Sequence, residues 1–102
     1  NRKETKMIRV EIIANQSVHE EIIKNLEAVV PDFCYSLIPL VYGRGKKSYK
    51  LGTTIWPETN FILIAYCPET AETDIQTVIE YEKKKFPDEG IKIFVLHDKK
   101  PE

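Results

Sequence analysis

The chain has 102 residues, which is enough for one domain with one hydrophobic core and too few for a second domain. Hydrophobic residues make up 42% and charged residues 30%, which is typical of globular proteins. Fifteen basic side chains stand against sixteen acidic ones, so no overall charge favours nucleic acid or an anionic membrane. We expect one folded domain over residues 7–98, flexible ends at 1–6 and 99–102, and no nucleic-acid partner.

The longest apolar runs, residues 61–66 and 93–96, are too short to cross a bilayer, and no secretion-type signal is visible near the start. Only two cysteines occur, Cys34 and Cys67, which is too few for a disulfide scaffold. These features predict a cytoplasmic protein with reduced thiols and no membrane insertion.

A strand and a helix are predicted first along the chain. Apolar and charged residues alternate from residue 7 to about 14, which is the period of a half-buried strand. Ser17 and Glu20 have the spacing of a capping box, and apolar residues then recur at helical spacing. The helix should end near Val30, because the residue before Pro31 is pushed out of the helical region.

Two strands should follow, separated by a long loop. Residues 33–42 are rich in aromatic and branched side chains, although Pro39 cannot donate to a sheet and indicates an edge strand or a bulge. Residues 60–67 are apolar on both faces, as in a central strand. The intervening loop contains three glycines and a proline and has no regular period.

Residues 70–86 have the apolar stripe of a helix, with acidic residues near its start and lysines 83–85 in its last turn, as the helix dipole favours. The segment 87–90 breaks this helix, and residues 91–95 alternate as a fourth strand. The order β-α-β-β-α-β predicts an α+β, ferredoxin-like fold: a four-stranded antiparallel sheet with two helices on one face. The apolar second face then predicts an oligomer.

The loop at residues 43–58 is the strongest candidate for a binding function. Four basic side chains lie among three glycines between residues 43 and 52, and Glu58 is the only acid before the third strand. Glycine lets backbone amides approach a ligand, and Arg or Lys supplies positive charge, so the loop suits an anion or an acidic protein surface. An equally weighted alternative is that the loop is a solvated hairpin tip, whose charges only keep the protein soluble. Trp56 is expected to pack at the base of this loop or to anchor a partner.

No residue pattern indicates catalysis or a metal site. Cys34 and Cys67 should lie near one another across a hairpin, but neither they nor His19 and His97 have metal-ligand spacing. The simplest expectation is two buried thiols and two surface imidazoles. Nothing places a base beside a serine or a cysteine, so we expect a protein that is not an enzyme.

Two short motifs resemble the nitrogen-regulatory PII-like superfamily, which comprises trimeric ferredoxin-like proteins of the PII and CutA types. Residues 41–45, Val-Tyr-Gly-Arg-Gly, are similar to the V-x-G-x-G entry to that family's long loop. Residues 90–95, Gly-Ile-Lys-Ile-Phe-Val, resemble its G-K-I-F-V strand. The resemblance implies a homotrimer that holds an adenine nucleotide between subunits, with Gly43 and Gly45 at the loop base and Lys92 at the phosphates.

The chain departs from that pattern in its long loop, which is shorter than in PII proper, and in the family's glycine-rich turn, which is reduced to Pro87-Asp88-Glu89-Gly90 with two acids where an anion would approach. It is therefore similar to the divergent PII-like proteins. The resemblance implies a signalling protein, a trimeric sensor or adaptor, whose 43–58 loop binds a target protein and whose subunit cleft takes a small anionic or nucleotide ligand. The candidate binding residues are Gly43, Arg44, Gly45, Lys46, Lys47 and Lys92. The alternative is a CutA-like metal-tolerance accessory protein.

Overall fold

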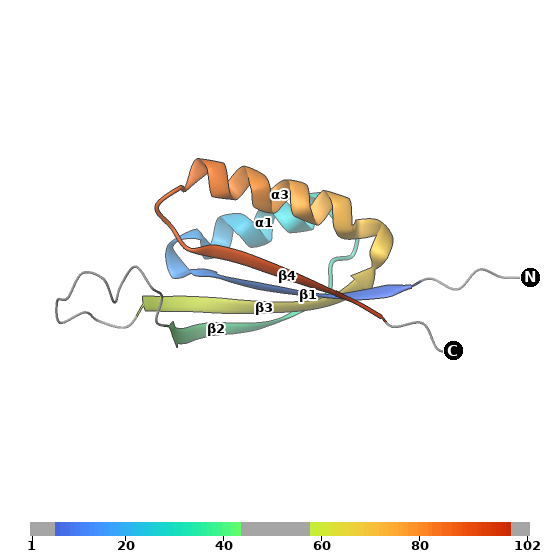
Figure 1. Cartoon of the computed structure of the whole chain (residues 1–102), viewed down its shortest axis with the longest axis horizontal. Helices are drawn as coiled ribbons and strands as arrows, with labels where there is room; N and C mark the ends of the chain where they lie inside the picture. The colour runs from blue at the N-terminus through green and yellow to red at the C-terminus, as the bar shows by residue number, and fades with distance from the viewer. Residues whose placement is uncertain (1–5, 44–57, 99–102) are drawn as a thin grey trace, which may run out of the picture.

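The computed structural model describes residues 6–43 and 58–98, which form a sheet covered by two helices (Figure 1). The elements, in chain order, are β1 (Met7–Asn15), a short 3-10 helix (Gln16–Val18), α1 (His19–Val29), β2 (Tyr35–Gly43), β3 (Glu58–Pro68), a second 3-10 helix (Glu69–Ala71), α3 (Glu72–Lys85) and β4 (Ile91–His97). The predicted order of strands and helices is confirmed. Among the residues that the structure describes, no helix is long and apolar enough to span a membrane.

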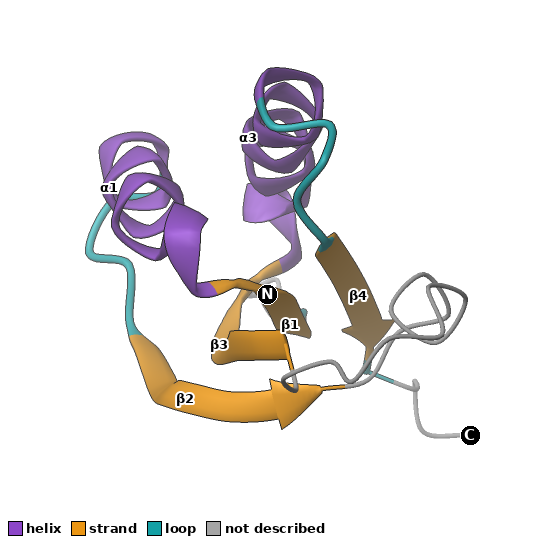
Figure 2. Cartoon of the chain, turned by 90° about the vertical axis from the view of Figure 1, so that its left-hand side faces the viewer, coloured by secondary structure: helices purple, strands orange, loops and turns teal. Residues whose placement is uncertain are grey.

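The strands lie in the order β2-β3-β1-β4, and every neighbouring pair is antiparallel. Both helices cover the same face, as the view along the strands shows (Figure 2). The predicted ferredoxin-like fold is therefore correct. β2 is an edge strand, and its pairing with β3 shifts between Ile38 and Val41, on either side of Pro39. Because proline has no N–H to donate, an edge position or a bulge was predicted here, and the structure has both.

The core lies between the sheet and the helices. Alternate residues of each strand point into it, and they meet the apolar stripes of α1 and α3. Its largest fully buried apolar side chains are Phe61, Ile8, Ile12, Ile22, Leu26, Leu63, Ile75 and Ile79. Burying each of these side chains contributes roughly 1.5–3 kcal/mol, so this layer holds the two halves of the fold together.

The start of the first helix differs from the expectation. No capping box forms at Ser17; instead Asn15 Oδ1 accepts a hydrogen bond of 2.9 Å from the Ser17 amide, and the 3-10 helix precedes α1. The backbone N–H of Asn15 also donates to the Gly90 carbonyl at 3.0 Å. Asn15, at the end of β1, is therefore the residue whose side chain caps the first helical turn.

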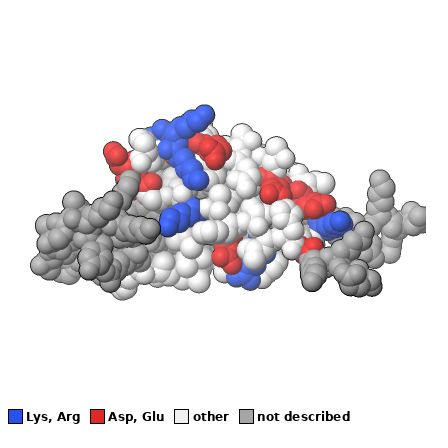
Figure 3. Space-filling model, viewed as in Figure 1, with Lys and Arg blue, Asp and Glu red and all other residues white. Residues whose placement is uncertain are grey.

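Charges on α3 follow the predicted dipole pattern. Glu72 and Asp74 lie in its first turn, and Lys83, Lys84 and Lys85 lie in its last. In the space-filling view the basic side chains gather over the end of this helix and acidic ones over its start (Figure 3). This arrangement stabilises the helix and leaves its outer surface polar.

The face of the sheet turned away from the helices is apolar, and we call it the open face. Exposed or partly exposed apolar side chains from all four strands lie on it: Met7, Ile13, Ile38, Ile62, Ile64, Tyr66, Phe94 and Leu96. A small polar group crosses it, in which Arg9 contacts Glu11 at 2.7 Å and the Tyr66 hydroxyl at 2.6 Å. An apolar sheet face of this extent is typical of a surface that another protein chain covers.

Candidate ligand site at the loop end of the sheet

All four strands meet at one end of the sheet, which we call the loop end. There β2 finishes at Gly43, β3 begins at Glu58, β1 finishes at Asn15 and β4 begins at Ile91. The pairing of Asn15 with Asn60 brings the end of β1 level with the start of β3. The connection between β2 and β3 and the turn before β4 therefore leave the sheet at the same end.

The predicted site residues fall into two groups at this end. Gly43 pairs with Glu58 at one edge of the sheet, and Lys92 pairs with Ile13 beside the other edge. Two strands, β3 and β1, lie between β2 and β4, so one chain does not bring Gly43 and Lys92 together. The other candidates, Arg44, Gly45, Lys46 and Lys47, and most of the 43–58 loop lie outside the described residues.

Lys92 lies on the open face of the sheet. Its neighbours Ile91 and Ile93 point toward the helices, and strand alternation therefore turns Lys92 the other way, where it is exposed. Within residues 6–43 and 58–98 its ammonium forms no ion pair. An exposed lysine at the rim of an apolar face is suited to bind an anion that arrives with a neighbouring molecule.

The turn before Lys92 is firmly held at both ends. The Glu89 amide donates to the Phe86 carbonyl at 3.1 Å, and the Gly90 carbonyl accepts from Asn15 at 3.0 Å. A Cβ added at Gly90 would meet no atom within 4 Å. The backbone at Gly90 is thus open to close approach from outside, and the folded chain alone does not need glycine there.

Sequence reasoning missed the environment of His19, which is not the surface imidazole we expected. Its ring packs edge-on against Phe61, with centroids 5.0 Å apart and planes inclined by 69°, and Nε2 is buried with no partner among the described groups. Nearby, Gln16 Nε2 donates to the Asn60 carbonyl at 3.4 Å. The packing depends on Phe61, which is 42 positions and two elements away along the chain, so no local pattern indicated it.

The expectation of two buried thiols is wrong for one of them. Cys67 is buried on the helix side of β3, but Cys34 is exposed in the turn before β2, where its thiol lies 3.2 Å from the Asp32 carbonyl. Asp32, two residues before Cys34, has a positive φ of 53°, and the neighbours of Cys34, Phe33 and Tyr35, pack against the core while its own side chain is exposed. His97 is exposed, as expected, and contacts Glu72 at 2.7 Å. Residues 6–43 and 58–98 contain no group of three side chains suited to hold a metal ion.

The two thiols should differ in reactivity. Burial raises the pKa of the Cys67 thiol, and the thiolate is the reacting form, so we expect an aromatic disulfide reagent to modify Cys34 alone in the native protein. Both thiols should react in guanidinium chloride. The absorbance of the released chromophore measures the reaction. In the native state, the Cys34→Ser variant should release no chromophore. Loss of the native signal in Cys67→Ser instead would contradict this assignment.

Comparison with protein-family models and with curated protein sequences finds no match. Comparison with solved structures does. A PII-like protein from Thiomonas intermedia, CPII bound to ADP and bicarbonate, aligns with a TM-score of 0.68 at 18% identity over 91% of this chain and 86% of that one. The chain has a PII-like fold. A PII-like protein from Thermus thermophilus aligns with a TM-score of 0.62 at 14% identity, covering 92% of this chain and 88% of that one.

The PII-like fold extends over nearly the whole chain. The GlnK–ATP complex of Bacillus subtilis also aligns with a TM-score of 0.62 at 15% identity, over 95% of this chain and 85% of that protein. The resemblance suggested by the motifs at 41–45 and 90–95 is therefore confirmed at the level of the fold. At these identities the likeness concerns the path of the chain, and ligand and partner must be argued from the chain's own residues.

Proposed function

We propose that this chain is a non-enzymatic PII-like regulatory protein that works as a homotrimer and binds an adenine nucleotide or a related anion in the cleft between subunits. The 43–58 loop contacts a target protein, and the bound ligand controls that contact. Lys92 supplies positive charge to the phosphates, and the backbones at Gly43 and Gly90 approach the ligand closely.

The position of the two candidate groups on opposite edges at one end of the sheet carries this proposal. Gly43 and Lys92 cannot meet within one chain, because two strands separate β2 from β4. Edge β2 of one copy and edge β4 of a neighbour can meet around a ring. The structural neighbours CPII and GlnK were solved with ADP and ATP respectively, which supports a ligand of this class.

The open face supports self-association. Its exposed apolar side chains come from all four strands, with Ile38, Tyr66, Phe94 and Leu96 each between 44% and 59% exposed. Burial of such an apolar surface against another copy of the chain lowers the free energy, so association is favoured over exposure to water. A ring of three copies that turns these faces inward would cover them and align the edges that carry Gly43 and Lys92.

Calorimetry with ATP, ADP, AMP and bicarbonate tests the ligand. We expect an adenine nucleotide to bind, and we expect Lys92→Ala to weaken binding about tenfold or more, because a charge-assisted contact contributes roughly 1.5–3 kcal/mol. Gly90→Ala should also weaken binding while leaving the thermal midpoint nearly unchanged, since its Cβ meets no atom of the same chain.

Lys6→Ala is the matched control, because Lys6 is exposed and precedes β1 at the opposite end of the sheet. It should leave nucleotide affinity unchanged. Absence of heat with all four compounds would overturn the ligand proposal. A titration with Cu²⁺ that gives heat, and loses it in Cys34→Ser or His97→Ala, would favour the CutA-like alternative instead.

A further inference from the structure

Glu82 is the only charged side chain that is fully buried among the described residues, with 0% of its surface exposed. It lies on α3, where the neighbouring charged residues Glu80 and Lys83 are exposed. Carboxylates are rarely buried to this extent unless a partner neutralises them. The position therefore calls for a physical explanation.

The partners of Glu82 come from α1. Asn25 Nδ2 donates to Glu82 Oε2 at 2.5 Å, whereas Oε1 is buried and has no partner among the described groups. The Glu21 carboxyl also approaches it, but Glu21 already accepts two hydrogen bonds from Lys85, at 2.9 and 3.0 Å. Glu82 thus has one neutral donor, one acidic neighbour and no cation of its own.

The surroundings raise the pKa of the Glu82 carboxyl group. Burial raises the pKa of Glu82, and its interaction with Glu21 raises that pKa further, while the Asn25 hydrogen bond and the more distant Lys85 charge oppose the shift. The remaining charged group near this cluster is Lys24, whose positive charge lowers the pKa of Glu21. The strands contribute only apolar side chains to the core on the other side. A proton on Glu82 would supply a donor for the neighbouring Glu21 carboxylate, which a charged Glu82 lacks.

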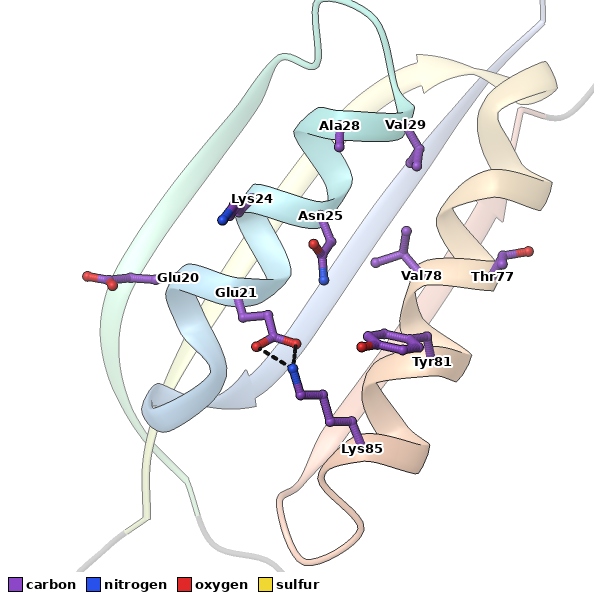
Figure 4. A pocket seen from close by; sticks show the side chains of 10 residues that line it. All are labelled: Glu20, Glu21, Lys24, Asn25, Ala28, Val29, Thr77, Val78, Tyr81 and Lys85. Atoms are coloured by element: carbon purple, nitrogen blue, oxygen red, sulfur yellow. Dashed lines mark hydrogen bonds and ion pairs between the residues drawn. The ribbon is translucent and has the colours of Figure 1, made fainter.

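This cluster lies beside a groove that separates the two helices. The groove has a volume of about 740 Å³. Glu21, Asn25, Tyr81 and Lys85 line one part of it and point toward one another, and Val78 and Val29 line another (Figure 4). Asn25 belongs both to the groove wall and to the contact with Glu82, so it connects Glu82 to the groove.

We propose that Glu82 is a proton-controlled latch between α1 and α3. With the proton bound, Glu82 joins α3 to Glu21 and Asn25 of α1 and keeps the groove narrow. When the proton leaves, two carboxylates face each other at the helix interface, and the helices separate at this point to admit water. The latch acts within one chain and does not depend on nucleotide binding.

The direction of the pH effect follows from linkage. The pKa of Glu82 is higher in the folded protein than in the opened state, where a glutamate titrates near about 4.3. The stabilisation is complete below that value and is lost as the pH rises through the folded-state pKa. Glu21 has a lowered pKa, mainly because of Lys85, so its contribution changes only on the acidic side of about 4.3. Above that pH, the titration of Glu82 should determine how the stability of the helix contact changes with pH.

Hydrogen exchange at the α1 and α3 amides, corrected for intrinsic rates, tests the latch between pH 5 and 8. Each opening event releases one proton, so the opening constant should rise by up to about tenfold per pH unit until the folded pKa is passed. The amides of β1 and β3 should change less. Glu82→Gln, which keeps the shape and the Asn25 contact without an ionisable group, should remove the pH dependence and raise the thermal midpoint at pH 8 by roughly 5 °C.

Glu80→Gln is the control, because Glu80 is an exposed carboxylate on the same helix, and it should behave as the wild type. Titration of the Glu82 side-chain carbon by NMR in the wild-type protein provides a test that needs no variant. A Glu82 pKa at or below about 4.3 would overturn the latch, as would equal pH dependence in Glu82→Gln and wild type or equal loss of protection in sheet and helices.

Discussion

Phe94→Glu is expected to convert the proposed trimer into monomers. Phe94 is 49% exposed on β4, and it is paired across the sheet with Glu11 of β1, both on the open face. The substitution removes an apolar side chain from the surface proposed to be covered. It also places a second carboxylate opposite the first, which is unfavourable in water and costs several kcal/mol where a partner excludes water.

Sedimentation equilibrium at micromolar concentration measures the result. The wild-type protein should sediment at about three times the chain mass of 11.9 kDa, and the variant at the chain mass itself. Tyr81→Glu is the matched control, because Tyr81 is 54% exposed but lies on α3, in the opposite layer of the fold. A monomeric wild-type protein, or a trimeric Phe94→Glu variant, would contradict the proposed assembly.

Phe61→Ala is expected to have the largest effect on stability. Phe61 is fully buried on β3, it is paired with Ala14 of β1, and its ring packs against His19 at the start of α1. Removing the ring leaves a cavity where the sheet meets the first helix, and large-to-small changes of this kind cost about 3–5 kcal/mol. That is a large part of the roughly 5–15 kcal/mol by which domains are stable.

Urea unfolding followed by circular dichroism provides the measurement, at one fixed protein concentration because self-association contributes to stability. Phe61→Leu is the control, since it keeps a branched apolar side chain in the site and should lose much less stability. A cost below about 1 kcal/mol for Phe61→Ala would mean that the surrounding core closes over the gap instead of leaving a cavity.

Much of the fold follows from local patterns. The alternation over residues 7–14 predicted β1, Pro31 predicted the end of α1, and Pro39 predicted an edge strand or a bulge in β2, where the structure has both. Each of these features depends on neighbouring residues or on the covalent structure of proline. They could therefore be predicted without knowledge of distant contacts.

The sites were harder to predict because they depend on contacts between distant segments. Glu82 lies three and four residues beyond Ile79 and Val78, so helical periodicity already pointed it toward the core. No local pattern showed that Asn25, 57 positions earlier in the chain, would donate a hydrogen bond to the Glu82 carboxylate. The capping box predicted at Ser17 does not form, and Asn15, at the end of β1, caps the first turn instead.

By itself, the sequence determined the strands and helices, their order and the apolar open face, because these depend on periodicity and turn chemistry over a few residues. Only the tertiary structure decided that Gly43 and Lys92 lie on opposite edges of one end of the sheet, that Cys34 is exposed while Cys67 is buried, and that Glu82 is buried against α1. Strand order and helix packing are set by contacts between residues far apart in the chain. No local pattern encodes which distant side chains will meet.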